Sequence, residues 1–413
     1  MVMSIYETIS QCRSCSSVAL KKVFSLGDTY VSDYLDAPSG GIKAPLTLVL
    51  CLGCGLVQLE HTVERDAIYK KYWYRSGIND SMKQALRDVT KAAERTVRLL
   101  DNDVVVDIGA NDGTLLETYS NPKLDKLGFE PAKNLIPDNA LHNIIIPNYF
   151  NTHDYFDYMT KKAKVITAIA MFYDLPNPNA FLQGVKQTLA KDGIFIIQQN
   201  YLPDMLVNNA FDNIGHEHLE YYSMYTLESL LNRNGLETFD LEFNGVNGGS
   251  FRTYIQHKDG SRQVKPKVTE VARIDRYWKQ VGPFTRFSKR VSNITYKLRY
   301  WVDLWKHVDK TIYVYGASNR GSTILQAADI DSHTIKAAAD RNPDKIGKFI
   351  AGTGIPIVSE EEARKDADYF LVLPYSFMPE FIVREQQFLA RGGKFIVPLP
   401  EPKIVDKDGE RPL

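Results

Sequence analysis

The chain has 413 residues, more than one ordinary domain contains, and its length predicts two or three domains. Lys and Arg together number 50, as do Asp and Glu, so the formal net charge is zero. This balance argues against broad nucleic-acid or membrane-surface binding, which needs excess positive charge. We find no secretory signal and no apolar run of bilayer-spanning length. We therefore expect a cytoplasmic protein with reduced cysteines and with neither a nucleic-acid nor a membrane partner.

The first segment of the chain contains every cysteine, arranged as two C-x-x-C pairs. Short β-like runs at 46–51 and 56–59 flank the second pair and predict a small hairpin-rich module. Two thiolate pairs on tight turns suit tetrahedral Zn²⁺, and four protein ligands leave no place for a catalytic water. We predict one structural zinc ion, with free or redox-active thiols as the alternative. The expected ligands are Cys12, Cys15, Cys51 and Cys54.

Apolar strands then alternate with helical patterns, which indicates a parallel sheet covered on both faces. Residues 81–100 have helical spacing of apolar side chains. The strands of this unit are predicted at 104–109, 127–130, 165–170 and 193–198.

The loop after the first of these strands carries the clearest ligand-binding pattern, Asp107-Ile-Gly-Ala-Asn-Asp-Gly113. Its two glycines permit a close turn beneath a ligand, and its acidic edge favours an amino group and a sulfonium over a pyrophosphate. An acid at the end of the next strand can hold two ribose hydroxyls. The pattern differs from G-x-G-x-x-G, which disfavours a dehydrogenase, and it predicts S-adenosyl-L-methionine as cofactor. A structural turn without a ligand is the alternative. The candidate cofactor-binding residues are Asp107, Gly109, Asn111, Asp112, Gly113 and Glu130.

The segment from Asn213 to Tyr222 reads Asn-Ile-Gly-His-Glu-His-Leu-Glu-Tyr-Tyr and is the best candidate for chemistry. A histidine can remove a proton from a carbon next to a carbonyl group, and a neighbouring carboxylate can orient it. A tyrosine hydroxyl can donate to the enolate that forms. A metal-binding histidine pair and an ordinary surface turn are the alternatives. The catalytic candidates are His216, Glu217, His218 and Tyr222.

The last third of the chain predicts a helical connector and a second Rossmann-like unit. Residues 274–305 have the spacing of a long helix or helix pair. Strands are predicted at 311–316, 335–340, 369–373 and 394–398. The glycine turn at 316–321 begins this unit, and its N–H groups and Arg320 are predicted to bind phosphate. A structural cap over the crevice is the alternative.

Taken in this order, the motifs resemble the sugar C-methyltransferase family, whose members methylate a carbon of nucleotide-linked keto-deoxysugars. The resemblance extends over essentially the whole chain. It includes the paired C-x-x-C module, the segments 107–113, 211–218 and 248–252, and the C-terminal segments 315–321 and 340–343. It implies an α/β protein: a zinc-binding module at 1–70, a class I methyltransferase domain at 71–259, a helical connector at 260–308 and a Rossmann-like substrate domain at 309–413.

The resemblance also implies roles for individual residues. His218 would be the base and Glu217 its acidic neighbour, and the stretch 72–76, with Tyr74 and Ser76, would cover the cofactor. One departure is Gly215, where the described sugar enzymes carry a tyrosine. Tyr221, Tyr222 or another donor would then have to replace that hydroxyl. The residues expected to border the sugar nucleotide are Asn247, Ser250, Arg252, Ser318, Asn319 and Arg320.

We therefore predict a methyltransferase dependent on S-adenosylmethionine that methylates a carbon of a nucleotide-linked keto-deoxysugar through an enolate. An O- or N-methyltransferase acting on another small metabolite is one alternative, and a non-catalytic zinc-module scaffold is another. The sequence leaves open the sugar, the methylated carbon and the oligomeric state.

Overall fold

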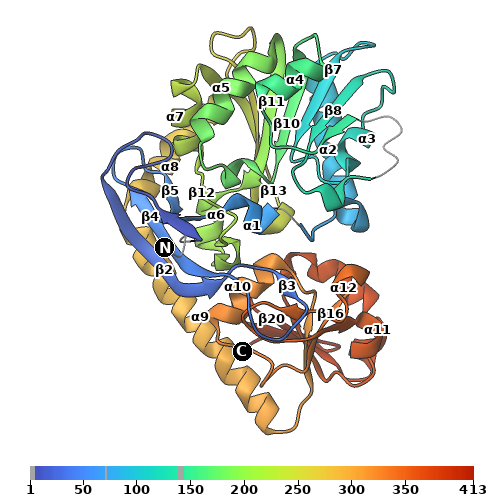
Figure 1. The fold of residues 1–413 in the computed structure, drawn as a ribbon. Coiled ribbons are helices and arrows are strands. Elements are labelled where there is room, and N and C mark those ends of the chain that lie inside the picture. The colour runs from blue at the N-terminus through green and yellow to red at the C-terminus, as the bar shows by residue number, and fades with distance from the viewer. Residues whose placement is uncertain (1–4, 70–71, 138–143) are drawn as a thin grey trace.

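The computed structural model describes residues 5–69, 72–137 and 144–413. The predicted domain boundary at residues 70 and 71 lies outside these ranges, and so does the side chain of Asn247. Figure 1 shows two lobes, each built around a sheet. The N-terminal strands and one long helix run along one side of the molecule and connect both lobes.

The N-terminal module is built mainly from antiparallel strands. Strands β2, β4 and β5 form a sheet with β12, which comes from far along the chain, beside β5. The β4–β5 hairpin confirms the predicted strands around the second cysteine pair. The elements are β1 (Tyr6–Thr8), β2 (Leu20–Tyr30), β3 (Tyr34–Leu35), β4 (Lys43–Cys51), β5 (Val57–Leu59), β6 (His61–Val63) and α1 (Arg65–Tyr69).

The central lobe contains a seven-stranded sheet of order β13-β14-β11-β10-β7-β8-β9. Strand β14 is antiparallel to both neighbours, and the pairs from β11 to β9 are parallel. All five residues of β7 are buried, as expected for a strand covered on both faces. The elements are η1 (Ser76–Ile78), α2 (Asp80–Thr96), β7 (Val104–Ile108), α3 (Thr114–Glu117), β8 (Asp125–Phe129), η2 (Lys133–Leu135), β9 (Ile144–Ile146), α4 (Thr152–Tyr158), β10 (Ala163–Ile169), η3 (Phe172–Asp174), α5 (Pro178–Thr188), β11 (Leu189–Asn200), α6 (Leu202–Val207), η4 (Phe211–Asn213), β12 (Glu220–Tyr221), α7 (Met224–Arg233), β13 (Leu236–Asn244), η5 (Val246–Gly248) and β14 (Ser250–His257).

The C-terminal lobe contains a second seven-stranded sheet, of order β18-β16-β15-β19-β20-β21-β22. Its first five strands are parallel, which confirms the Rossmann-like pattern predicted for this part of the chain. The elements are β15 (Ile312–Tyr315), α10 (Asn319–Ala327), β16 (Ala337–Asp340), η7 (Pro343–Lys345), β17 (Phe349–Ile350), β18 (Ile357–Ser359), α11 (Glu360–Ala363), β19 (Tyr369–Val372), η8 (Tyr375–Phe377), α12 (Met378–Arg384), α13 (Gln386–Ala390), β20 (Lys394–Val397), β21 (Lys403–Asp406) and β22 (Gly409–Pro412).

The predicted helical connector is divided in three: α8 (Pro266–Asp275), η6 (Arg276–Lys279) and the long helix α9 (Gly282–His307). Helix α9 begins beside Pro283, because proline fits the first turn of a helix but not its interior. Its buried residues recur every three or four positions, so one face packs inward and the other meets solvent. Among the described residues, no helix has the length and apolarity needed to cross a membrane.

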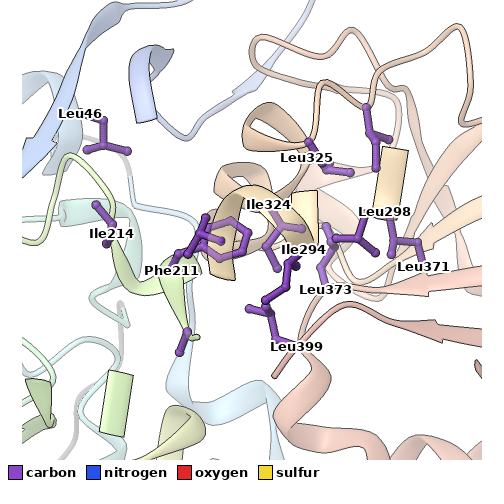
Figure 2. Packing of buried hydrophobic residues seen from close by; sticks show 14 of the residues in the cluster. Leu46, Phe211, Ile214, Ile294, Leu298, Ile324, Leu325, Leu371, Leu373 and Leu399 are labelled. Atoms are coloured by element: carbon purple, nitrogen blue, oxygen red, sulfur yellow. The ribbon is translucent and has the colours of Figure 1, made fainter. Parts of the chain in front are cut away.

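One apolar core joins the three parts of the chain (Figure 2). It contains Leu46 from β4, Phe211 and Ile214 from the η4 loop, Leu298 from α9 and Ile324 from α10, all nearly inaccessible to solvent. Burial of each such side chain stabilises the fold by about 1.5–3 kcal/mol. The η4 loop, which immediately precedes the His-Glu-His segment, is therefore held between the N-terminal module and the C-terminal lobe.

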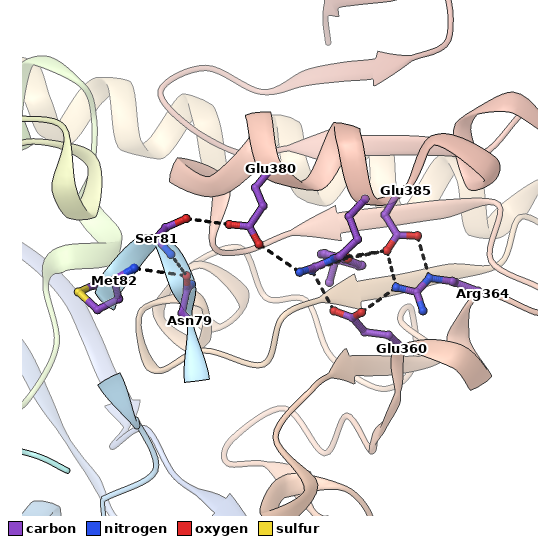
Figure 3. A network of polar contacts seen from close by, with 9 residues as sticks. Asn79, Ser81, Met82, Glu360, Arg364, Glu380 and Glu385 are labelled. Atoms are coloured by element: carbon purple, nitrogen blue, oxygen red, sulfur yellow. Dashed lines mark hydrogen bonds and ion pairs between the residues drawn. The ribbon is translucent and has the colours of Figure 1, made fainter. Parts of the chain in front are cut away.

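A polar network joins the two lobes at a second place (Figure 3). The Ser81 hydroxyl at the start of α2 donates to Glu380 of α12 at 3.0 Å, and Arg384 pairs with Glu380 and with Glu360. Such partly exposed pairs contribute about 0–1 kcal/mol each. The apolar core of Figure 2 therefore contributes most to holding the lobes together.

Candidate functional site

The four cysteines predicted to bind zinc converge in one cluster. All four sulfur atoms lie within 4.8 Å of one another, and the Cys12–Cys54 and Cys15–Cys51 sulfurs are 3.7 and 3.6 Å apart. Sulfurs placed about 2.3 Å from a tetrahedral zinc ion would be separated by about 3.8 Å. The Gln58 side-chain amide donates to the Cys12 sulfur at 3.2 Å, a contact that favours a thiolate. The site fits a structural zinc ion with four sulfur ligands.

The predicted cofactor loop has the conformation that a close ligand approach requires. Gly109 and Gly113 have φ values of +75° and +82°, which side chains disfavour. A Cβ atom at Gly109 would lie 3.0 Å from the side chain of Met171, so a larger residue in this turn would also require Met171 to shift. The loop therefore keeps its backbone open at the carboxyl end of β7, where ligands bind in parallel sheets.

Two buried carboxylates border this loop. Thr167 donates to Asp107 at 2.6 Å, and burial raises the pKa of Asp107 to about 8. Glu130 accepts the N–H groups of Asn111 and Ala132 at 2.9 and 2.8 Å, while burial raises its pKa. A cationic amino group would stabilise ionised Asp107, and Glu130 has remaining acceptor capacity for ribose hydroxyls. These groups fit S-adenosylmethionine.

The segment predicted to cover the cofactor lies over this loop. The Ser76 N–H donates to the Asn111 side chain at 3.0 Å, and that side chain donates in turn to the Tyr74 carbonyl. The Gly77 N–H donates to Asp112 at 2.7 Å. Asn111 and Asp112 therefore hold the covering segment in place, a role that sequence reasoning assigned to neither residue.

His218 has the geometry of a neutral base. Its Nδ1 lies 2.6 Å from the carbonyl oxygen of Asn213, and because a carbonyl can only accept, Nδ1 carries the proton. Nε2 is therefore unprotonated and lies 3.6 Å from Glu217. Burial and the nearby positive charge of Arg320 together lower the pKa of His218 to about 4, although the hydrogen bond to Asn213 opposes the shift. At neutral pH the nitrogen Nε2 is available to take a proton.

Glu217 lies beside this nitrogen in an environment that favours its protonated form. Burial raises the pKa of Glu217 to about 7, although Asn319 and the charge of Arg320 oppose the shift. The Asn319 amide donates to Glu217 at 3.5 Å. Glu217 can therefore exchange a proton near neutral pH, unlike an exposed glutamate.

The sheet of the N-terminal module positions the His-Glu-His segment. The Leu59 N–H donates to the Leu219 carbonyl at 2.9 Å, and β12 then pairs with β5. Between the two cysteines of the first pair, Arg13 approaches buried Glu220 to 4.0 Å. The strand that follows His218 thus belongs to the sheet of the zinc-binding module, so the position of the His-Glu-His segment depends on the order of that module.

The remaining catalytic candidates occupy different places. The His216 ring lies 3.0 Å from the Ala44 carbonyl and lines a cavity with Glu217 and His218. Tyr222 is buried against Phe172, near the cysteine cluster, and lines neither of the two cavities described around His218. Tyr221 does line the second of these cavities. Of the two tyrosines considered as replacements at Gly215, Tyr221 is the one that the fold brings to His218.

The glycine turn of the C-terminal lobe comes directly to the His-Glu-His segment. Ser318 caps α10 by accepting the Gly321 N–H, and Asn319 reaches Glu217. Arg320 lines the cavity with Glu217 and His218 but is already paired, because two of its nitrogens contact Asp212 at 2.6 and 3.0 Å. Asn319 and Arg320 therefore contact protein groups of the candidate active site, whereas Ser318 caps the helix that carries them.

The other predicted substrate loop is only partly at the site. A Cβ atom at Gly248 would lie 3.6 Å from the Tyr375 hydroxyl, so this turn borders the Arg320 region. The Ser250 hydroxyl donates to the Val246 carbonyl. Arg252 instead bonds Gln198 and the Asp88 carbonyl of α2, and it lines neither described cavity.

Sequence reasoning missed three residues that the fold brings to this site. Asp212 lies inside the segment 211–218 that supported the family resemblance, but it was assigned no role from the sequence. Its position in that segment, next to Asn213, could have marked it as a candidate. The Tyr173 ring centre lies 4.5 Å from that of His218, and Tyr375 donates to Asp212 at 3.1 Å. Neither tyrosine has a local sequence pattern that distinguishes it from the 23 tyrosines of the chain.

Similarity to a characterised relative extends over the full chain. The C-methyltransferase NovU of Streptomyces niveus is 31% identical over 419 aligned positions, covering 98% of this chain and 99% of the relative. Solved structures match a smaller part. The plantazolicin methyltransferase BpumL in complex with SAH is 14% identical over 42% of this chain and 82% of its own, with a TM-score of 0.33. The mitomycin 7-O-methyltransferase MmcR is 15% identical over 44% and 59%, with a TM-score of 0.30.

Three family models match successive parts of the chain. Residues 12–69 match a model described as "Putative zinc binding domain", residues 79–241 a methyltransferase domain, and residues 245–400 a C-methyltransferase C-terminal domain. Their order is the one that the sequence motifs predicted. With the full-length similarity to NovU, these matches establish that the chain belongs to the C-methyltransferase family that combines these three domains.

Proposed function

We propose that this protein transfers a methyl group from S-adenosylmethionine to a carbon next to a ketone in a nucleotide-linked keto-deoxysugar. The observation that carries the proposal is the contact of His218 Nδ1 with the Asn213 carbonyl, which leaves Nε2 beside Glu217 in the cavity that both residues line. An unprotonated ring nitrogen can take a proton from a carbon whose C–H is made acidic by the neighbouring ketone. The similarity to a C-methyltransferase over the whole chain supports transfer to carbon.

In the proposed reaction, Nε2 of His218 takes the proton, and the C–H electron pair passes into an enolate. Tyr221, which lines the cavity beside His218, would donate to the enolate oxygen. S-adenosylmethionine, when bound, supplies an electrophilic methyl group, and its sulfonium charge is lost when the new C–C bond forms. The ionised form of Glu217, which is populated near neutral pH because the pKa is about 7, can accept the proton from His218 afterwards. Holding the reacting atoms in line supplies much of the rate.

Glu130→Gln is expected to weaken cofactor binding by about 10-fold or more, because the amide replaces one acceptor oxygen with a donor that faces the Asn111 or Ala132 N–H. Isothermal titration of S-adenosylmethionine into the purified protein measures the change. Glu117→Gln, which alters an exposed carboxylate of the same domain, is the matched control and should bind normally. Equal affinities for all three proteins would remove Glu130 from the cofactor site.

The experiment that tests the acceptor uses a panel of nucleotide-linked keto-deoxysugars in heavy water, read by mass spectrometry. Gain of one methylene, with deuterium exchange at the acidic C–H in the absence of cofactor, is expected for carbon methylation through an enolate. Methyl gain at oxygen or nitrogen would contradict the proposed transfer to carbon. Cofactor binding without a change in any member of the panel would contradict the proposed class of acceptor.

A further inference from the structure

Arg320 and Asp212 form an ion pair between the two lobes. Arg320 lies in the first turn of α10, and Asp212 lies in η4 of the central lobe. Two guanidinium nitrogens contact Oδ2 of Asp212 at 2.6 and 3.0 Å, and the Tyr375 hydroxyl donates to Oδ1 at 3.1 Å. The Asp212 side chain is only 2% exposed. Both of its oxygens are therefore engaged by groups from the C-terminal lobe.

The residue after this aspartate contacts the catalytic candidate directly. The Asn213 carbonyl accepts the Nδ1–H of His218 at 2.6 Å, and the Asn213 side chain accepts from Asn200 at 2.7 Å. A shift of η4 would therefore move the group that keeps the proton on Nδ1. Without that acceptor the imidazole can place its proton on Nε2, where it could no longer act as a base.

We propose that Arg320 is a positioning residue: by holding Asp212, it keeps the Asn213 carbonyl against His218 and so fixes the orientation and tautomer of that side chain. The C-terminal lobe would then orient the proposed base as well as bind substrate. The functional part of this inference rests on the proposed role of His218 as the base.

The alternative role for Arg320, a ligand for the substrate phosphates, fits the same geometry less well. To bind a phosphate, Arg320 would have to share or leave a carboxylate that is already buried, and unpaired buried charges are strongly unfavourable. The ionised carboxylate would also repel a phosphate at the same place. In addition, the charge of Arg320 lowers the pKa of both His218 and Glu217, so it acts on the catalytic pair in the absence of substrate.

The test is nuclear magnetic resonance of the full-length protein with ¹⁵N-labelled histidine, which reports the tautomer of each imidazole without any substrate. The His218 signals are assigned by their loss in His218→Gln. In wild type, Nδ1 of His218 should be protonated and Nε2 not. In Arg320→Gln, the Nδ1–H form should lose population, and His218 should titrate at higher pH because a nearby positive charge is gone.

Asp212→Asn separates position from charge. This variant keeps the charge of Arg320 but weakens the contact between Arg320 and η4. The tautomer of His218 should therefore change, while the pH at which His218 titrates should rise less than in Arg320→Gln. Tyr375→Phe removes only one contact and should produce a smaller tautomer change in the same direction, which keeps the test informative if the other variants fold poorly. Arg391→Gln, an exposed arginine of the same lobe, is the matched control.

An unchanged His218 tautomer in folded Arg320→Gln and Asp212→Asn would overturn the inference, whatever the enzyme's substrate is. Affinity for thymidine diphosphate and uridine diphosphate, measured by titration calorimetry, should be the same in wild type and Arg320→Gln. Weaker nucleotide binding with an unchanged tautomer would assign Arg320 to the phosphates instead. In the methyl-transfer assay, the expected result is a fall in kcat of about 10²-fold with little change in KM.

Discussion

Replacement of His218 by glutamine is expected to lower methyl transfer by about 10²–10⁴-fold, the usual contribution of a positioned general base. Glutamine can still contact the Asn213 carbonyl through its amide, but it has no nitrogen that can take a proton at neutral pH. Affinity for S-adenosylmethionine should stay near that of wild type. The residues proposed to bind the cofactor, Asp107 and Glu130, lie at the ends of β7 and β8 and not in the segment that carries His218. Single-turnover kinetics and cofactor titration measure the two quantities separately.

The control for this change is His153→Gln, which replaces a histidine that is 85% exposed on α4 and should leave turnover unchanged. A His218→Gln protein that folds and turns over like wild type would remove His218 from the mechanism. A drop that results only from weaker cofactor binding would contradict the assigned role as well, since the base should act on the chemical step.

The same assignment predicts the acid limit of activity. A base must be unprotonated, and burial lowers the pKa of His218 to about 4, so kcat/KM should fall only as the pH drops toward that value. An ordinary exposed histidine would give a fall near pH 6.5. Glu217 must be ionised to accept the proton from His218, so with its pKa of about 7 it should make kcat fall as the pH drops through neutrality. The two groups are close enough to titrate as a pair.

Loss of the zinc site is expected to unfold the N-terminal module and to abolish activity, although no cysteine lines the two cavities described around His218. Structural zinc sites contribute about 10–16 kcal/mol in isolated zinc-finger peptides, compared with a total stability of about 5–15 kcal/mol for a typical protein. In Cys54→Ser, metal analysis should show well under one zinc per chain. Because β12 pairs with β5 directly after His218, disorder in the module should spread to the base.

Leu52→Ser is the matched control, since Leu52 lies between the cysteines of the second pair and is 52% exposed. It should keep one zinc per chain and full activity. Native thermal stability and turnover in a metal-free Cys54→Ser protein would show that the four sulfurs do not need a metal. Full zinc content with lost activity would point to an effect of the serine itself.

Several features follow from short-range sequence patterns. The paired C-x-x-C spacing predicted a four-sulfur cluster, because two residues between cysteines place both thiols on one turn. The alternation of apolar strands and helices predicted the parallel part of both sheets, and the turn with Gly109 and Gly113 predicted a loop with an open backbone. In each case the pattern itself lies within a few positions, so spacing alone carries it, although the meeting of the two cysteine pairs depends on residues 42 and 36 positions apart.

Tertiary structure decided what surrounds the base. Sequence reasoning grouped Tyr222 with the histidines, but successive residues of an extended segment point in opposite directions, so Tyr221 faces the cavity and Tyr222 lies near the cysteines. Arg320 and Asp212 are 108 positions apart, and no local periodicity relates them. Their contact depends on how the two lobes pack around the shared core. The sequence alone therefore determined the local elements and the chemistry they carry, whereas the packing of three chain segments determined which groups surround His218.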